Sequence, residues 1–237
     1  VYSGLAGPDV SYILDKTPRY YFIIPEIYRL YPDAKFIFLF RNPLSVAASL
    51  VESFFRGHLG DYRHRVDMFE GPRYLVRGFE QIREHSFSLQ YEDLVREPDV
   101  WLERLCNYLE IPFETSMSTG FKDVPVGDMG DQFGSRQYNE LATDTVEKWR
   151  SVFSTGYRRR YLKKYLRYLG KDTIEGMGYD YSELDKHIDG LTVRFDLSIE
   201  DRVRELICLI YSTFELPLLR RKLAQRKRDR RKLYMHH

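Results

Sequence analysis

Two short apolar runs are the strongest strand signals in the hydrophobic pattern of the chain. Residues 35–40 (KFIFLF) are almost continuously apolar, which is typical of a central strand covered on both faces. Residues 86–91 (SFSLQY) alternate instead, with Phe87, Leu89 and Tyr91 on one side. Helical segments lie between the two runs, so the pattern predicts an α/β fold with a parallel sheet.

Apolar residues at helical spacing predict helices along most of the remaining chain. The predicted helices cover residues 25–31, 43–54, 99–109, 143–153, 157–169 and 198–214. Asn42 suits the N-cap of the second helix and Pro43 its first position, while Ser198 and Asp201 resemble a capping box before the last helix. Residues 115–142 hold four glycines and are expected to form a long polar loop.

The composition is that of a globular protein and not of a disordered tail. Of the 237 residues, 43% are apolar and 15% aromatic, which is enough to bury a core of ordinary size. No run of about 18 apolar residues is present and the first residues lack signal-peptide features, so a cytoplasmic location is expected. The chain opens with Val1 and not Met, which leaves open whether it is a fragment of a longer protein and whether an anchor lies upstream.

The cysteines and histidines of the chain do not form a metal-ligand pattern. Cys106 and Cys208 both lie among apolar residues, which favours buried hydrophobic thiols over a disulfide or a metal site. The six histidines are scattered along the chain. We therefore expect a protein that binds no metal.

The formal charge of +2 hides a strong asymmetry. Residues 218–232 contain nine Lys or Arg residues and one Asp, which leaves the rest of the chain with a net charge of −6. Such a tail is a candidate contact for an anionic glycan or a membrane surface, although a solvated end is the simpler interpretation. It lacks the interleaved aromatic residues of a stacking platform, so no nucleic acid partner is expected.

One cation lies at a position where α/β proteins bind phosphate groups. Arg41 follows the first predicted strand and precedes the next helix, whose N-terminal N–H groups and dipole would face an anion. Ser49 lies about two turns along the same helix, so both side chains could grip one phosphate. Taken alone, an arginine after a strand is more often a structural ion-pair partner.

Four segments around Arg41 resemble motifs of one enzyme family. Residues 41–49 (RNPLSVAAS) are similar to the 3′-phosphate motif of the sulfotransferases, in which an arginine is followed by Asn-Pro and a later serine. Residues 15–36, which begin DKTPRYYF and end YPDAKF, resemble the segment that leads into the same strand. Residues 90–95 (QYEDLV) resemble the adenine-side motif, and residues 147–150 (EKWR) resemble a late tryptophan helix. Four motifs in the order of the family are more specific than any one.

The resemblance implies a fold, a reaction and a set of site residues. The fold would be a P-loop-like three-layer parallel sheet flanked by helices, with a helical C-terminal appendage. The reaction would move a sulfuryl group from 3′-phosphoadenosine 5′-phosphosulfate to an acceptor hydroxyl without a metal, releasing 3′,5′-adenosine bisphosphate. Arg41 and Ser49 would bind the 3′-phosphate, Tyr91 would border the adenine, and Arg136 would close over the nucleotide. Lys16 would be the catalytic residue, neutralising charge on the leaving phosphate oxygen.

The same resemblance bears on the acceptor and on the general base. The cytosolic small-molecule branch has Lys-Thr-His where this chain has Lys16, a threonine and Pro18, and a proline cannot accept a proton. The sequence is therefore nearer the branches that act on carbohydrates or proteins, where a carboxylate commonly serves as the base. We expect a carbohydrate acceptor, and Asp15, Glu52 and His58 are the remaining candidates for the base.

A donor loop that follows a first strand is the family feature missing from this sequence. Residues 1–14 contain small residues but neither a preceding strand nor a cation to cradle the 5′-phosphosulfate. Either that loop lies upstream of Val1, or the chain is a non-catalytic nucleotide-binding protein that keeps the 3′-phosphate site. We expect an α/β domain over residues 1–180, a helical extension over 181–217 and a basic tail over 218–237.

Overall fold

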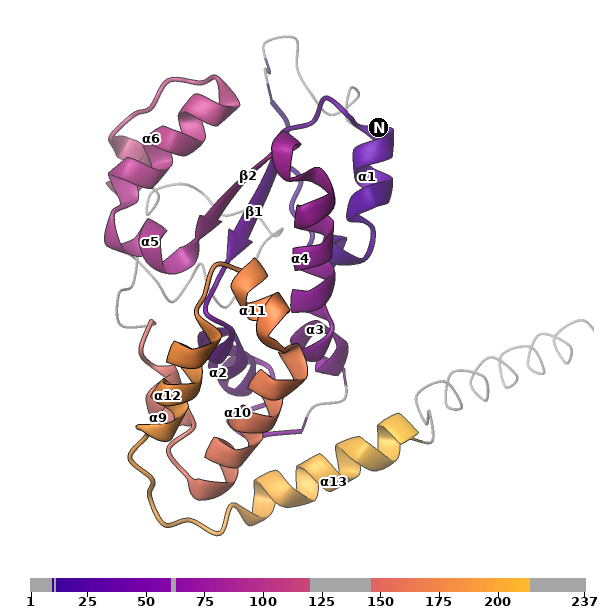
Figure 1. Cartoon of the computed structure of the whole chain (residues 1–237), viewed down its shortest axis with the longest axis vertical. Coiled ribbons are helices and arrows are strands. Elements are labelled where there is room, and N and C mark those ends of the chain that lie inside the picture. The colour runs from indigo at the N-terminus through magenta and orange to yellow at the C-terminus, as the bar shows by residue number, and fades with distance from the viewer. Residues whose placement is uncertain (1–9, 11, 61–62, 120–145, 214–237) are drawn as a thin grey trace, which may run out of the picture.

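The computed structural model describes residues 10, 12–60, 63–119 and 146–213 of the chain (Figure 1). In chain order the elements are η2 (Tyr20–Phe22), α1 (Ile24–Leu30), β1 (Phe36–Phe40), α2 (Pro43–Ser53), α3 (Arg65–Phe69), α4 (Gly71–Ile82), η3 (Arg83–His85), β2 (Ser86–Gln90), α5 (Tyr91–Arg96), α6 (Pro98–Leu109), α7 (Ser116–Thr119), α9 (Trp149–Val152), α10 (Gly156–Leu169), α11 (Lys171–Gly176), α12 (Tyr181–Asp189) and α13 (Ile199–Thr213). Within the described residues the protein is a helix-rich α/β structure.

The two strands form a small parallel sheet, as the hydrophobic pattern predicts. β1 and β2 pair in register from Phe36 opposite Ser86 to Phe40 opposite Gln90. The connection between them contains α2, α3 and α4. It is long enough to bring the chain back to the end of the sheet where β1 began, as a parallel pair of strands requires. The carboxyl ends of β1 and β2 therefore lie side by side, and the finer P-loop-like, three-layer description stays a prediction.

The two faces of β1 are covered unequally. Phe38 and Phe40 are buried against Phe79 of α4, with ring centroids 5.2 and 5.4 Å apart. On the opposite face Ile37 and Leu39 stay exposed within the described part of the chain. The expectation of a strand covered on both faces is therefore wrong for these residues.

The position of α6 explains this exposure. α6 packs over β2, where Phe87 contacts Trp101 and Tyr108 of the helix, with ring centroids 6.5 and 5.5 Å apart. α6 reaches β1 at Phe36, whose N–H donates to the Tyr108 hydroxyl at 3.0 Å, and Figure 1 shows β1 on the side of the sheet nearer α4. An apolar run in the sequence cannot distinguish a strand that is covered on both faces from one that is covered on a single face.

The larger hydrophobic cluster joins α2 to the helices that follow α9. It contains Leu44 of α2, Trp149 of α9, Tyr165 of α10, Ile174 of α11 and Ile188 of α12, each fully or almost fully buried. α12 lies beyond residue 180 and shares this cluster with α10. The predicted boundary at residue 180, between an α/β domain and a helical extension, stays a prediction.

Several helices agree with the predicted ranges, and others do not. α1, α2, α6, α10 and α13 fall within one or two residues of their predictions. The helix expected over residues 143–153 is present as the shorter α9, and residues 143–145 lie outside the described part. Most of the long loop expected over residues 115–142 also lies outside it, and its first residues form α7.

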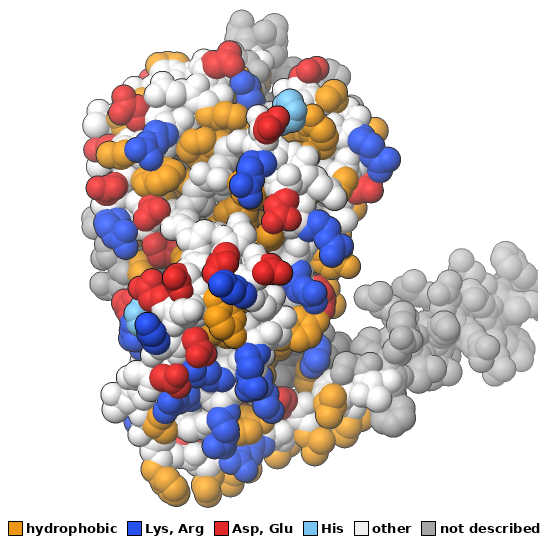
Figure 2. All heavy atoms as spheres, viewed as in Figure 1, with side chains coloured by type: hydrophobic (Ala, Val, Ile, Leu, Met, Phe, Trp, Pro, Cys, Tyr) orange, Lys and Arg blue, Asp and Glu red, His pale blue; other side chains and the backbone are white. Residues whose placement is uncertain are grey.

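Basic side chains gather on the lower part of the face shown in Figure 2, over α10. Acidic partners from α12 and α13 offset several of them. Lys163 contacts Asp185 at 2.5 Å and Asp189 at 2.8 Å, and Arg158 contacts Asp201 at 2.6 Å. Among the described residues, no helix is both long enough and apolar enough to cross a membrane.

Candidate functional site

The carboxyl ends of β1 and β2 bring together two residues that the sequence assigns to the site. Arg41 follows β1, and Tyr91 begins α5 directly after β2. The Arg41 guanidinium carbon lies over the Tyr91 ring, 4.4 Å from its centroid, which is within cation–π range. The parallel register therefore places a cation and an aromatic face, 50 residues apart in sequence, against each other at one edge of the sheet.

A buried carboxylate connects the same two strand ends. Glu92 lies in the first turn of α5 and is buried. Its Oε1 accepts a hydrogen bond from the Asn42 backbone N–H at 3.0 Å, and its Oε2 accepts one from the Tyr179 hydroxyl at 2.5 Å. Glu92 thereby fixes the backbone directly after Arg41. Glu92 lies within the QYEDLV motif, and the motif alone does not predict this structural role.

The segment after α11 supports this junction from a third side. Burial raises the pKa of the Tyr179 phenol, and the hydrogen bond to the Glu92 carboxylate raises it further, so the hydroxyl stays a donor at neutral pH. The Gln90 side-chain amide donates to the Gly178 carbonyl at 2.6 Å. A Cβ on Gly178 would lie 2.5 Å from the Gln90 Nε2, and its φ of +86° also favours glycine.

The N-terminus of α2 is capped as predicted, and the cap changes how an anion could bind there. The Asn42 side chain accepts a hydrogen bond from the Leu44 N–H at 2.9 Å. Pro43 has no N–H, and the Asn42 N–H is bound to Glu92. Because these amides are engaged or absent, an anion at this end of α2 would depend mainly on side chains and on the helix dipole.

Ser49 lies on α2 two turns after the cap and is half-buried. Ser45, one turn closer to Arg41, is buried, and its hydroxyl donates to the Val146 carbonyl at 2.9 Å. Ser45 therefore holds the segment before α9 against α2 and is engaged in structure. Of the two serines on this face, Ser49 is the one more accessible to a ligand.

Lys16 lies in the exposed segment that leads to η2. Three residues later Arg19 fixes that segment to α3, with hydrogen bonds of 2.8 and 2.6 Å to the two carboxylate oxygens of Asp67. Tyr21 donates to the same carboxylate. Burial raises the pKa of Asp67, but the hydrogen bonds from Arg19 and Tyr21 outweigh burial and hold it below its usual value.

The structure therefore unites part of the predicted site. Arg41 and Tyr91 are in contact, and Ser49 lies on the helix that begins beside them. No contact between Lys16 and Arg41 is recorded in the described part of the chain. Arg136 lies outside the described residues.

The candidates for the general base all have other partners. Asp15 accepts a hydrogen bond from the Tyr20 hydroxyl at 2.7 Å, and Glu52 pairs with Lys148 at 2.8 Å. His58 lies 3.3 Å from Glu200 and 3.6 Å from Asp201, near the start of α13. The described residues also contain no group of three or more His, Cys, Asp or Glu side chains that could hold a metal ion.

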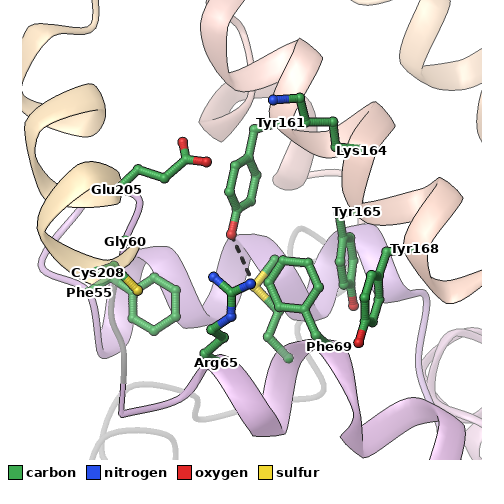
Figure 3. Close-up of a pocket in the computed structure, with 11 residues that line it drawn as sticks. Phe55, Gly60, Arg65, Phe69, Tyr161, Lys164, Tyr165, Tyr168, Glu205 and Cys208 are labelled. Atoms are coloured by element: carbon green, nitrogen blue, oxygen red, sulfur yellow. Dashed lines mark hydrogen bonds between the residues drawn. The ribbon is translucent and has the colours of Figure 1, made fainter. Parts of the chain in front are cut away.

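A cavity of about 200 Å³ lies elsewhere, between α3, α10 and α13 (Figure 3). Aromatic rings form much of its lining, together with Arg65, Lys164 and Glu205. The Tyr161 hydroxyl donates to the Met68 sulfur at 3.8 Å, and the Arg65 guanidinium lies over the Phe69 ring at 5.3 Å. The lining shares no residue with the junction at the strand ends.

Comparisons with known proteins agree with this arrangement at the level of the family. Residues 5–115 match the model of the "Sulfotransferase family". A "Putative protein-tyrosine sulfotransferase" of Caenorhabditis elegans is 27% identical over 180 residues, covering 68% of this chain and 66% of the relative. A protein of the same description from Caenorhabditis briggsae is 26% identical over 185 residues, covering 72% of this chain and 64% of the relative. The chain thus spans just under two thirds of the length of these curated relatives.

One solved structure is also similar. It is the "Sulfotransferase Domain from the Curacin Biosynthetic Pathway", with 23% sequence identity, a TM-score of 0.44, and coverage of 63% of this chain and 60% of that chain. The match over residues 5–115 and the two Caenorhabditis relatives, which align over a longer part of the chain, support a sulfotransferase family for this chain.

Proposed function

We propose that this protein transfers a sulfuryl group from 3′-phosphoadenosine 5′-phosphosulfate to an acceptor hydroxyl, with the nucleotide bound at the carboxyl ends of β1 and β2. The observation that carries the proposal is the contact of Arg41 with Tyr91 at that edge, beside the N-terminus of α2. A fixed cation, an aromatic face and a helix N-terminus are the groups that a purine nucleotide with an extra phosphate requires.

The proposed donor site uses the residues in distinct roles. Arg41 and Ser49 hold the 3′-phosphate, and the Tyr91 ring borders the adenine. Arg41 also lies against Tyr91, so the cation is pre-oriented before the nucleotide arrives. Since the first amides of α2 are engaged or absent, the charge of Arg41 supplies most of the attraction. Arg136 is proposed to close over the bound nucleotide.

The proposed chemistry is a single displacement at sulfur. The acceptor oxygen forms a bond to the sulfur while the bond between sulfur and the bridging oxygen breaks. The bridging oxygen keeps the electron pair and remains on the 5′-phosphate of the departing 3′,5′-adenosine bisphosphate. The acceptor proton passes to a general base that lies outside the assigned residues. Lys16 stabilises the negative charge that grows on the bridging oxygen.

Two classes of acceptor are open to this chemistry, and both present a hydroxyl. The sequence favours a carbohydrate, whereas the Caenorhabditis relatives are named for protein tyrosine. We propose a carbohydrate hydroxyl and take a tyrosine peptide as the competing acceptor. Transfer of labelled sulfuryl to a panel of oligosaccharides and tyrosine peptides, by the natural full-length protein, distinguishes the two.

The role of Lys16 is tested in the same assay. Lys16→Ala is expected to lower kcat by roughly 10²–10³ with little change in donor affinity, because the charge it meets develops only in the transition state. Lys16→Arg should rescue part of the rate, since the guanidinium keeps the charge but not the shape. Lys35→Ala, another exposed lysine that pairs with Glu110, is the matched control and should retain full activity.

Two outcomes contradict these assignments. If Lys16→Ala lowers only the melting temperature and leaves kcat within a few fold, Lys16 is a structural residue. If 3′,5′-adenosine bisphosphate binds but no acceptor receives label, the protein is a nucleotide-binding member of the family without transfer activity.

A further inference from the structure

α13 turns its charged side toward the body of the protein. Asp201 is buried, and its carboxylate accepts hydrogen bonds from the Arg158 guanidinium at 2.6 and 3.0 Å and from the Leu59 N–H at 2.9 Å. Glu205, one turn later, accepts a hydrogen bond from the Tyr157 hydroxyl. A further turn on, Cys208 is buried at the edge of the cavity in Figure 3.

The opposite side of α13 is apolar and faces solvent. Five large aliphatic side chains at helical spacing are between 42% and 64% exposed: Ile199, Val203, Leu206, Ile207 and Ile210. We call these five residues the outward face of α13. Phe195, in the segment before the helix, is 95% exposed. Figure 2 shows hydrophobic side chains along the lower edge of the molecule, where Figure 1 places α13.

This orientation is the reverse of an ordinary surface helix. A surface helix buries its apolar stripe and exposes its charged side, because apolar area is stabilised by removal from water. α13 instead holds the acids Asp201 and Glu205 inward, hydrogen-bonded to Arg158 and Tyr157, and leaves an apolar stripe outward. A contiguous exposed patch of this kind marks a surface that another apolar body covers.

The attachment of α13 to the body is specific, so the outward face is held in place. The N-terminal half of the helix approaches Gly60 closely, since a Cβ on that glycine would lie 2.6 Å from the Arg204 carbonyl carbon. Arg158 also donates to the Gly57 carbonyl at 2.6 Å and to the Val152 carbonyl at 3.0 Å. These contacts tie α13 to the loop after α2 and to α10.

The charge of the chain beyond α13 indicates what covers the outward face. Residues 218–232, which start eight positions after Ile210, carry nine basic residues and one acid. The acids of α13 are already paired, because Glu200 lies 2.7 Å from Arg204 and Asp201 pairs with Arg158. The sequence that follows the outward face therefore carries a net positive charge. An apolar helix face followed by a polybasic segment is complementary to a surface of anionic phospholipids.

We propose that the outward face of α13 docks onto an anionic phospholipid surface, with residues 218–232 supplying electrostatic attraction to the lipid headgroups. This contact would hold the protein on the membrane as a peripheral protein, with the strand ends of β1 and β2 at a distance from the lipid. The proposal is independent of sulfuryl transfer, since no residue assigned to the donor site lies in α13 or after it.

A second copy of the chain is the main competing occupant. Two α13 helices packed in parallel through their outward faces would bring two polybasic segments to the same end, and like charges there repel. An antiparallel pair avoids this repulsion but leaves the polybasic segments without an anionic partner, whereas an anionic lipid surface is complementary to both the apolar face and the basic segment. Sedimentation of the chain without lipid distinguishes the two.

The test is flotation of the 237-residue chain with vesicles. One set contains phosphatidylcholine alone, and the other contains phosphatidylcholine with about 30% phosphatidylserine, which gives the surface a negative potential. We expect binding to the anionic set, weakened as salt concentration rises because screening reduces the electrostatic part. Deletion of residues 218–237 should remove the dependence on phosphatidylserine.

Substitutions in the outward face test the apolar part. Leu206→Ser with Ile210→Ser is expected to lower the partition coefficient by about tenfold or more, because two half-exposed side chains lose their burial in lipid. Leu30→Ser with Val100→Ser is the control, since both side chains are exposed on α1 and α6, and it should bind as the unaltered chain does. Circular dichroism confirms folding, and Val203→Ser with Ile207→Ser is the second variant if the first does not fold.

Three results would overturn the proposal. The first is absence of binding to anionic vesicles. The second is unchanged binding in both outward-face variants. The third is a dimer without lipid that the same substitutions dissociate, which would assign the outward face to a second copy of the chain.

Discussion

Glu92 determines the position of Arg41 although it is not itself a candidate to touch the nucleotide. Its two carboxylate oxygens hold the Asn42 N–H and the Tyr179 hydroxyl, so it joins the end of β1 to the segment after α11. A buried carboxylate with both oxygens occupied is stable only while both donors stay in place. The binding of a phosphate that we propose for Arg41 would therefore depend on a residue 51 positions away.

Replacing Glu92 tests this link. Glu92→Gln is expected to lower the free energy of unfolding by about 1–3 kcal/mol, because the amide nitrogen would face a donor and leave it without an acceptor. Urea denaturation at neutral pH measures the change. Asp93→Asn, which removes a partly exposed ion pair with Arg96, is the control and should change stability by less than about 1 kcal/mol. Equal effects of the two substitutions would contradict a special role for Glu92.

The sequence predicted some of the contacts at this junction and not others. Asn42 as a cap follows from its place before Pro43 and an apolar stripe, and the structure confirms it. The contact of Arg41 with Tyr91 follows from the register of β1 and β2; the sequence predicted the parallel sheet but not this register. The role of Glu92 did not follow, because its partner Tyr179 lies 87 residues away and only tertiary packing brings them together.

The anchoring of α13 rests on one buried ion pair that titrates. Burial raises the pKa of Asp201, but hydrogen bonds from Arg158 and the Leu59 N–H outweigh burial and lower it below its usual value. Because the pKa is lower in the folded protein, the pair stabilises the fold above the unfolded pKa of about 3.9. That contribution is lost as pH falls through the folded pKa.

Asp201→Asn should reveal this dependence. At pH 7 the substitution is expected to lower the free energy of unfolding by about 3 kcal/mol, since it leaves the Arg158 charge buried and unpaired. The difference from the unaltered chain should shrink as pH falls below the unfolded pKa of about 3.9 and through the lower folded pKa, because the native carboxylate becomes protonated only there. Asp189→Asn, whose carboxylate is exposed, should show a much smaller difference. A constant difference across this pH range would contradict the assignment.

Substitution of two glycines in the loop after α2 distinguishes the effect of backbone strain from the effect of a collision with α13. Gly57 and Gly60 both have positive φ, but a Cβ on Gly57 meets nothing within 4 Å, whereas one on Gly60 would collide with α13. Gly57→Ala should destabilise by roughly 1–2 kcal/mol through strain alone. Gly60→Ala should cost more and should accelerate hydrogen exchange in α13. Equal exchange in the two variants would show that α13 does not depend on this approach.

Helices with clear start and stop residues were predicted well, and short ones were not. α2 begins at a capped proline and α10 ends before Gly170, so residues next to the helix ends determine where these helices begin and end. α12 also has a local signal, because the Asp180 side chain accepts from the Glu183 N–H at 2.9 Å, and this signal was overlooked. The inverted orientation of α13 could not be predicted, because periodicity gives the apolar stripe but not the side that the body occupies.

No residue proposed for the donor site lies in α13 or in the sequence after it. Deletion of residues 218–237 is therefore expected to leave 3′,5′-adenosine bisphosphate affinity and transfer to a small acceptor unchanged within about twofold. Calorimetry and the transfer assay measure the two quantities. A collapse of the rate with intact folding would contradict this expectation, and a loss confined to acidic glycans would make the segment a substrate contact.

The central claim is that Arg41 at the end of β1 recognises the 3′-phosphate of the nucleotide. The measurement is calorimetric titration of the chain and of Arg41→Ala with 3′,5′-adenosine bisphosphate and with adenosine 5′-phosphate. Arg96→Ala, an exposed arginine at the end of α5, is the control. The account predicts that Arg41→Ala loses about 1.5–3 kcal/mol of bisphosphate binding, roughly tenfold or more, while adenosine 5′-phosphate binding stays the same. Equal losses for both nucleotides would contradict it.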